Sequence, residues 1–474
     1  MCLSLTAAAI ASGGASAQTD QANSPSIKPE SSAEGEGSLY PTPAIDSPLG
    51  VALGPARYVL SDTGLNADFR RRVAKAVAVH PLLRSERTTA SRSRAALDAE
   101  KAALYPQLTA NINGDYVLSR EFGTDTDNVV EALRPSGQAN AGLTVSQLLF
   151  DGGAAFARIR SARARERETK LNIDNRANEI ALAALASYHD VLAYQAIGAL
   201  SGEFVRRHEK LVEDLRERAR RGTGARADVE RAAARLANAR ARVLQFEESG
   251  RLADIRYQEF FATSPEKLMR PAFGALAVGS RDEAVAAALA RHPSLGAAYA
   301  RMDQAEALLR AEKARRRPEL RASVNAVKFD LGESDDYDVR AGLTLNYDLY
   351  AGGARRAGIA EARAAARQNE YDKDAVALGL ARDAATAYER QEITKARLDA
   401  LQDAVVAQYK ARDLVVERFR VARGDLLDLL QAENDWFEAG VAYLIASAGY
   451  DLAVYQMMAF TGDLQRLFSF DAAF

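Results

Sequence analysis

This chain contains the stretch Leu148-Leu149-Phe150-Asp151-Gly152-Gly153 and, 200 residues later, its counterpart Asp348-Leu349-Tyr350-Ala351-Gly352-Gly353. Apolar and polar residues alternate before each stretch, which is typical of a β-strand with one apolar and one polar face. A long Ala-, Arg- and Glu-rich segment of helical character follows each stretch. Because glycine lets the backbone change direction, we expect strand-to-helix junctions at Gly152, Gly153, Gly352 and Gly353.

Other motifs around these junctions also occur twice and in the same order. His80-Pro81 matches His292-Pro293 at an offset of 212 residues, and Gly224 matches Gly424 at an offset of 200. The offset changes only across the loops that join the alternating segments, and loops tolerate changes in length. The sequence therefore predicts a duplicated helix–strand–strand–helix–helix repeat.

The ends of the chain differ from the repeats in composition. The first 17 residues are apolar and small and end in Ala15-Ser16-Ala17, which is typical of a secretory signal with its cleavage site. The chain's only cysteine, Cys2, lies in that segment, so we expect no disulfide in the mature chain. Residues 18–60 are rich in Pro, Ser, Gly and Glu, a composition that favours a flexible extension.

We therefore predict a signal peptide over 1–17, a flexible extension over 18–60, a first repeat over 61–262, a linker over 263–280, a second repeat over 281–462 and a C-terminal tail over 463–474. The predicted strands cover about 107–119 and 137–150 in the first repeat, and about 320–330 and 337–350 in the second. The net charge of −2 gives no overall basic field, so nucleic acid is not an expected partner.

The strands and helices together indicate a membrane tunnel. Each predicted strand is long enough to cross an outer membrane at a tilt, for which about 9–11 residues suffice. Four strands cannot close a barrel, because about eight are needed and an open edge is costly in lipid. Three chains would supply about 12 strands. A continuous helix over 154–221 would be about 100 Å long at about 1.5 Å per residue, and apolar spacings of three and four predict coiled-coil packing.

The chain resembles the TolC family of outer-membrane export channels over about residues 65–462. The duplicated plan, the His-Pro pairs, the Gly-Gly junctions and the segment 424–433 carry this resemblance. It implies a mainly α fold with a small β part, in which a homotrimer forms a 12-stranded outer-membrane β-barrel continued by a long periplasmic α-helical coiled-coil barrel. It also implies a Gram-negative outer membrane and its lipid, a periplasmic adaptor (membrane fusion) protein, and an inner-membrane ABC transporter or proton-driven pump.

The resemblance implies functional residues as well. Periplasmic tip turns, where the adaptor docks, correspond to Gly222, Gly224, Ala225, Arg226, Gly424, Asp425, Leu426 and Leu427. The pore constriction at the periplasmic entrance corresponds to Asp428 and Gln431, where some members of the family carry two acids. Three copies of Asp428 near one axis would attract cations. In the alternative assignment Asp428 is a helix N-terminal acid favoured by the helix dipole, with Asp425 as the N-cap.

No constellation of residues indicates an enzyme, a cofactor or a metal. A phosphate-binding Gly-x-x-x-x-Gly-Lys motif is missing, and the four histidines (80, 189, 208 and 292) have no ligand spacing. The segment 426–437 resembles members that serve type I protein secretion, so the favoured function is the exit duct for that process. One alternative is the outer-membrane channel of a multidrug or small-molecule efflux pump. Another is a periplasmic coiled-coil structural protein without a pore.

Overall fold

The computed structural model describes residues 44–61, 63–64, 66–119, 121, 137–271, 278–331, 335–421 and 423–468. They belong to one unit, which spans Gly37–Phe474. The predicted signal peptide and residues 18–43 of the predicted extension lie outside the described residues.

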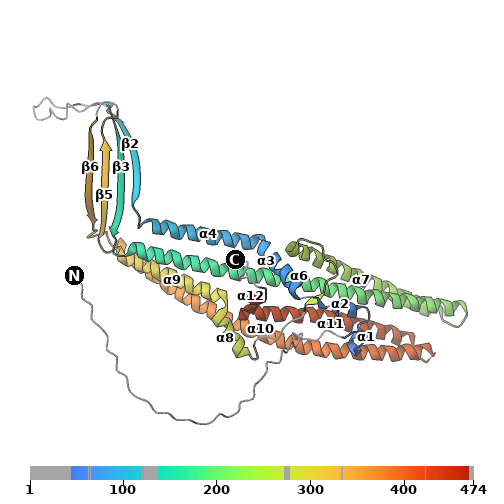
Figure 1. The fold of residues 1–474 in the computed structure, drawn as a ribbon. Helices are drawn as coiled ribbons and strands as arrows, with labels where there is room; N and C mark the ends of the chain where they lie inside the picture. The colour runs from blue at the N-terminus through green and yellow to red at the C-terminus, as the bar shows by residue number, and fades with distance from the viewer. Residues whose placement is uncertain are drawn as a thin grey trace, which may run out of the picture. The chain divides into compact units, whose positions relative to one another are not determined.

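The two repeats contain matching elements (Figure 1). The first comprises α3 (Asn66–Val79), α4 (Pro81–Ala102), β2 (Gln107–Tyr116), β3 (Gly137–Phe150), α6 (Ala154–Arg220) and α7 (Arg226–Phe261). The second comprises α8 (Arg281–Arg291), α9 (Pro293–Ala314), β5 (Glu319–Lys328), β6 (Tyr337–Asn346), α10 (Ala354–Arg420) and α11 (Leu426–Thr461). Helices α4 and α9 both have 22 residues, α6 and α10 both have 67, and α7 and α11 both have 36. The predicted duplicated, mainly α fold with a small β part is confirmed.

The repeated His-Pro pair starts a helix in each repeat. The imidazoles of His80 and His292 accept hydrogen bonds from the backbone N–H of Leu82 and Ser294, and proline occupies the first helical position of α4 and α9. Proline fits there because its missing N–H would have no partner within the helix. His80 also stacks on Phe260, and His292 on Phe460, with ring centroids 5.6 and 5.7 Å apart. These two histidines are therefore helix caps.

The four long strands form one antiparallel sheet in the order β2-β3-β5-β6. Three strands end earlier than predicted, because each ladder stops where its partner strand stops. Tyr116 pairs with Gly137, the first residue of β3, and Asn346 pairs with Glu319, the first residue of β5. The sequence pattern continues beyond these points, but the hydrogen-bonding partner does not.

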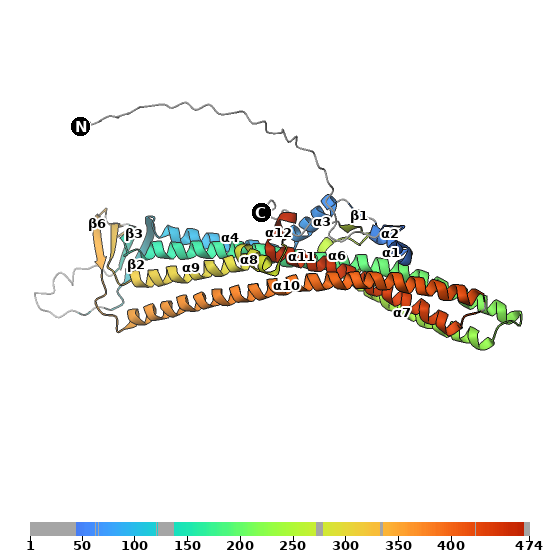
Figure 2. The ribbon, with the colours of Figure 1, turned by 90° about the horizontal axis from the view of Figure 1, so that it is seen from below.

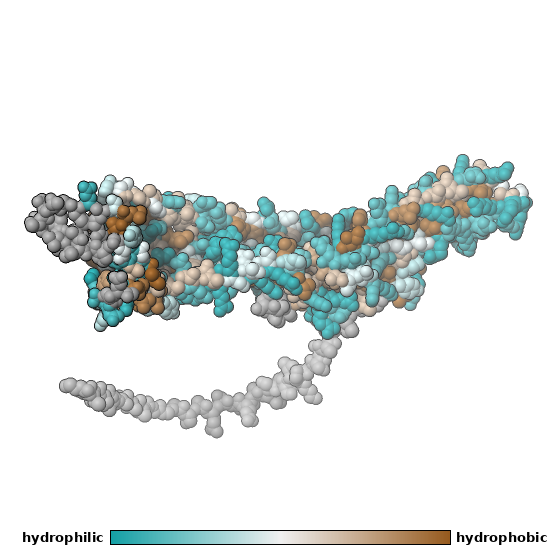
Figure 3. All heavy atoms as spheres, turned by 90° about the horizontal axis from the view of Figure 1, so that it is seen from above, coloured by the Kyte–Doolittle hydropathy of each residue, from teal (hydrophilic) through white to brown (hydrophobic). Residues whose placement is uncertain are grey.

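The sheet keeps one apolar and one polar face. Leu108, Val145 and Val324 follow one another across the first face, and Thr109, Thr144 and Asn325 across the other, where Thr144 Oγ1 donates to Asn325 Oδ1 at 2.6 Å. The apolar face is bare: Leu108 is 70% and Ile112 76% exposed. Figure 3 shows hydrophobic residues gathered at the sheet, whereas the helices present a mostly hydrophilic surface.

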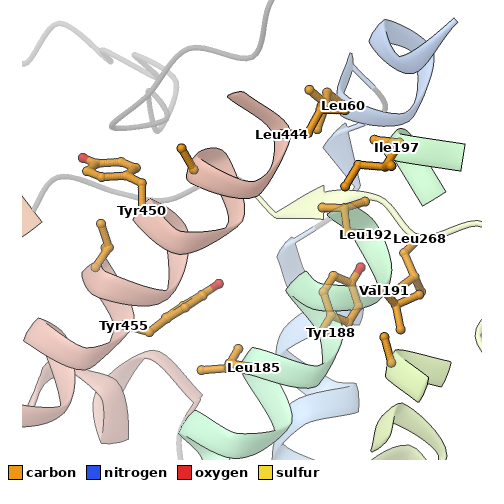
Figure 4. Close-up of a cluster of buried hydrophobic side chains, with 14 of the residues drawn as sticks. Leu60, Leu185, Tyr188, Val191, Leu192, Ile197, Leu268, Leu444, Tyr450 and Tyr455 are labelled. Carbon is orange, nitrogen blue, oxygen red and sulfur yellow. The ribbon is translucent and has the colours of Figure 1, made fainter. Parts of the chain in front are cut away.

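The long helices pack into two antiparallel hairpins, α6 with α7 and α10 with α11. Their turns lie at the same end of the helices, away from the sheet (Figures 1 and 2). The main core lies between α6 and α11, where Leu185 and Tyr188 lie across from Tyr455 (Figure 4). One described helix, α6, contains an 18-residue window apolar enough to cross a membrane, but 67% of that window is buried inside the protein. Packing accounts for its hydrophobicity.

The predicted flexible extension is wrong for residues 44–60. This segment contains α1 (Pro48–Ala52) and α2 (Ala56–Ser61), and it buries Leu53 and Leu60. The indole of Trp436 donates a hydrogen bond to the carbonyl oxygen of Ala52 at 2.8 Å. Pro48 starts α1 next to the N-cap Ser47, so this proline marks a helix start and not disorder.

The linker and the C-terminal tail are also more ordered than their predicted labels suggest. Strand β4 (Arg270–Pro271) pairs in parallel with β1 (Thr63–Gly64). Helix α12 (Asp463–Phe468) buries Leu464 and Phe468 in the main core. Apolar side chains outside the periodic segments therefore complete the core around α6 and α11.

Candidate functional site

The two hairpin turns share one backbone hydrogen bond. After α6, the N–H of Thr223 donates to the carbonyl of Arg218, and after α10 the N–H of Arg423 donates to the carbonyl of Arg418, both at 2.9 Å. Gly222 has a φ of +75°, which favours glycine. Gly224 and Gly424 follow at close approach, since a Cβ on either would lie 3.0–3.3 Å from backbone atoms of the preceding helix.

The residues after each turn start the return helices. Ala225 is the N-cap of α7 without a side-chain bond, and Arg226 is its first residue. Asp425 is the N-cap of α11, and its carboxylate accepts from the N–H of Leu427 at 3.1 Å. Leu426 is buried in a small cluster with Val212, Leu215 and Leu430, whereas Leu427 is exposed. Leu426 therefore joins the two hairpins, and Leu427 is free to contact a partner.

Asp428 and Gln431 lie on an exposed face of the first turns of α11. The Gln431 amide donates to Asp435 Oδ1 at 2.7 Å. Residues 428, 431 and 435 share a face, since they stand three and four positions apart. Sequence reasoning missed Asp435, although its spacing of seven from Asp428 was the available signal. This face carries two carboxylates in each chain.

A buried charge cluster lies further along α11. Glu433 lies between Arg207 of α6 and Arg412 of α10, at 3.8 and 3.6 Å. Arg412 is 2% exposed and stacks over Trp436, with its guanidinium carbon 5.2 Å from the ring centroid. Burial raises the pKa of Glu433 to about 7. The cluster connects three long helices, and sequence reasoning missed it because its members are far apart in the chain.

A second buried pair connects the linker to α11. Arg270 donates to both oxygens of Asp451, at 2.9 and 2.7 Å, and both residues are at most 2% exposed. His189 Nδ1 lies 3.4 Å from Asp451 Oδ2. Burial lowers the pKa of His189 to about 4, so this imidazole is neutral at pH 7.

The four junction glycines lie between the strands and the long helices. All have positive φ: +70° at Gly152, +91° at Gly153, +59° at Gly352 and +89° at Gly353. In the first repeat, Asp151 accepts from the N–H of Gly153 at 3.0 Å and of Ala155 at 2.5 Å, so it caps α6. The second repeat has Ala351 at the equivalent position, without such a carboxylate.

Within the described ranges, no group of three His, Cys, Asp or Glu side chains could hold a metal ion. What the chain presents is a bare apolar sheet face, two long helical hairpins and an acidic helix face near their turns. These features define the class of membrane-inserted export ducts that extend away from the bilayer. The profile of the family described as "Outer membrane efflux protein" matches residues 73–256 and 284–463, so the chain belongs to that family.

Individual relatives agree with this assignment. The chain is 26% identical over 368 residues to the outer membrane efflux protein BepC of Brucella suis, which covers 76% of this chain and 78% of BepC. It is 25% identical over 337 residues to protein CyaE of Bordetella pertussis, covering 68% and 70% of the two chains. The fold is similar to that of the outer membrane protein VceC of Vibrio cholerae, with a TM-score of 0.72 and 16% identity over 84% of this chain and 97% of VceC.

The predicted membership of the TolC family of outer-membrane export channels is confirmed, as is the location in the outer membrane with an extension into the periplasm.

Proposed function

We propose that three copies of this chain close one 12-stranded barrel and form the exit duct of a tripartite export system. The observation that carries the proposal is the open sheet. In the described part of the chain, β2 and β6 each pair on one side only, and the apolar face of the sheet packs against nothing. An open edge in lipid leaves backbone groups without partners, so closure by further copies is the way to satisfy them.

The helices also carry apolar stripes without a partner inside the chain. On α10, the exposed stripe consists of Tyr371, Leu378, Ile393 and Leu414, of which Leu378 is 74% exposed. On α7, it consists of Leu244, Leu252 and Ile255. Apolar rows at near-heptad spacing are typical of helix–helix contacts. Contacts between copies would bury both stripes and continue the duct into the periplasm.

We propose type I protein secretion as the process this duct serves. The support is the resemblance of segment 426–437, Leu-Leu-Asp-Leu-Leu-Gln-Ala-Glu-Asn-Asp-Trp-Phe, to members with that role. An ABC transporter would drive export, and an adaptor would contact the turns around Gly224 and Gly424. The duct would conduct passively.

Small-molecule efflux is the second candidate function, favoured by the description of BepC as an efflux protein. In that case a proton-driven pump would replace the ABC transporter. The two candidates differ in what the cell loses without the duct. We would delete the gene, complement it with the wild-type chain, and compare culture-supernatant proteins with susceptibility to drugs and dyes. Loss of a secreted protein with unchanged susceptibility supports secretion, and the reverse result supports efflux.

Assembly can be tested with introduced cysteines, because Cys2 is the only cysteine in the sequence. A chain carrying both Ile112→Cys on β2 and Leu343→Cys on β6 should cross-link between copies and yield dimers and trimers on a non-reducing gel. Each single variant is the matched control and should yield no trimer. A folded double variant that stays monomeric under oxidation would contradict the closed barrel.

A further inference from the structure

A cavity of about 360 Å³ lies where the strands meet the helices. Five arginines line it: Arg158 of α6, Arg315 and Arg317 between α9 and β5, Arg321 of β5, and Arg355 of α10. Asp151, Glu319 and Asp348 are the acids in its wall. The cavity therefore brings three guanidinium groups from residues 315–321 together with those of Arg158 and Arg355, which are distant in the sequence.

The cavity opens on the polar face of the sheet. Its strand residues include Gln107, Arg321 and Asn346. The register places all three on the face that carries Thr109, Thr144 and Asn325, opposite the bare apolar face. In the proposed barrel the apolar face contacts lipid, so the cavity faces the interior of the duct. This step depends on the proposed function.

The charge around the cavity is positive. The four segments that surround it, 98–107, 148–160, 312–321 and 346–356, contain ten Lys and Arg against six Asp and Glu. Several of the arginines already have carboxylate partners, as Arg158 has Glu100 at 3.3 Å and Arg321 has Glu319 at 3.0 Å. The excess of cations remains after these pairs are formed.

Two of the arginines have a donor to which no carboxylate is bound. Arg317 donates to the carbonyl of Gly152 at 3.0 Å and has no carboxylate partner among the described residues. Arg355 donates to Asp348 and to the carbonyl of Arg315, and its buried Nε has no hydrogen-bond partner in the described structure. Guanidinium groups bind phosphate and carboxylate in planar, two-bond geometry. Free donors in a cation-rich cavity are what such an anion requires.

We propose that this cavity is an anion-binding site in the wall of the duct, which takes phosphate and carboxylate groups of soluble molecules passing through it. Three copies would form a ring of such sites at the base of the barrel. A ring of cations in a pore wall raises the local concentration of anions and slows their passage. Lipid phosphate is the other source of the same chemistry, but it would approach from the apolar face.

The test is current block by inorganic tripolyphosphate, measured with the purified full-length protein in planar bilayers of zwitterionic lipid. We expect reversible block of the wild-type channel. The double variant Arg317→Gln/Arg355→Gln should need at least about tenfold more tripolyphosphate, since each tenfold step is about 1.4 kcal/mol of binding free energy. Arg251→Gln, a charge change on an exposed part of α7, is the matched control and should leave the block unchanged.

A further variant, expected to strengthen the block, keeps the proposal testable if the double variant misfolds. Asp348→Asn removes the carboxylate that pairs with Arg355, so less tripolyphosphate should suffice. Channels that open normally but show the same block in all variants would overturn the site while leaving the duct intact. Preparations that form no channels would instead contradict the proposed function. A block that weakens when anionic lipid is added would mean that headgroups occupy the cavity, which also overturns the proposal.

Discussion

The buried charges of this protein connect elements that are distant in sequence. Arg270 and Asp451 connect the linker between the repeats to α11. Because His189 beside them is neutral, Arg270 is the residue that compensates the negative charge of Asp451. Removing one partner of a buried pair leaves the other charge without compensation. Replacing Asp451 therefore tests how much this connection contributes to stability.

We expect Asp451→Asn to destabilise the protein by about 3–5 kcal/mol, because the Arg270 charge would stay buried without its counterion. The measurement is the Tm from circular dichroism in detergent. Asp68→Asn is the control, since Asp68 pairs with Arg72 in a half-exposed contact worth at most about 1 kcal/mol. Equal losses of Tm in the two variants would contradict the assigned role.

Glu433 predicts a dependence of stability on pH. Burial raises its pKa from 4.5 to about 7, against the lowering effect of Arg207 and with the added repulsion of Asp413 and Glu203. Between these two values the folded chain keeps a proton that the unfolded chain releases. The contribution of Glu433 to stability therefore falls as pH rises from about 4.5 through 7, by up to about 3 kcal/mol.

The variant Glu433→Gln isolates this contribution. Its side chain stays neutral, so the difference in Tm, variant minus wild type, should become more positive as pH rises from 5 to 8. The opposite effect of His189, whose lowered pKa costs stability as pH falls from 6.5 towards 4, is common to both proteins and cancels. A difference in Tm that does not change with pH would mean that Glu433 is ionised throughout.

At the scale of elements, the matching long helices of the two repeats have equal lengths but differ in how many of their residues are buried. Helices α7 and α11 have the same length, yet α7 buries only Ala232, Ala239, Ala253 and Tyr257, whereas most of α11 is buried. Gly440 of α11 shows the difference: a Cβ there would lie 2.7 Å from Cδ2 of Leu200 on α6. The matching position of α7 is Arg240, which pairs with Glu209 on the surface. Helix α11 of the second hairpin therefore packs so closely against α6 that only a small residue fits at position 440.

We expect Gly440→Val to destabilise the protein by about 1–3 kcal/mol, because an added branched side chain would overpack the contact between α6 and α11. Gly449→Val is the matched control on the same helix, since nothing lies within 4 Å of a Cβ at Gly449. The readout is again the Tm in detergent. A loss as large at position 449 would assign the effect to helix propensity and not to packing.

The sequence correctly predicted those helices and strands that a local pattern of residues determines. Alternation located the strands, but their ends depend on partners, as when β6 stops at Asn346 opposite Glu319. Proline content suggested disorder over 44–60, where Pro48 in fact starts a helix that packs beneath Trp436. At the candidate entrance, Asp428 and Gln431 could be chosen from sequence, whereas the contact of Glu433 with Arg207 and Arg412 joins three helices and leaves no local signal.

At the scale of the whole molecule, the proposed duct has charges of opposite sign at two levels along its length. The arginine-lined cavity lies at the base of the sheet, and the face with Asp428 and Asp435 lies beside the hairpin turns. If three copies bring these faces to one axis, the entrance should attract cations. The trivalent cobalt hexammine ion, added on the side of the hairpin turns, reports on that end separately from the arginines.

We expect Asp428→Ala to raise the cobalt hexammine concentration needed for half block about tenfold, and Gln431→Asp to lower it by a similar factor, or about 1.4 kcal/mol in each direction. The second change adds one carboxylate to each copy beside Asp435. Asp282→Asn, on the exposed start of α8, is the control and should have no effect. Because the two entrance variants change charge in opposite senses, general damage to the pore cannot produce both shifts. If neither variant alters the block, Asp428 lies off the axis and serves α11 as an acid near its N-terminus.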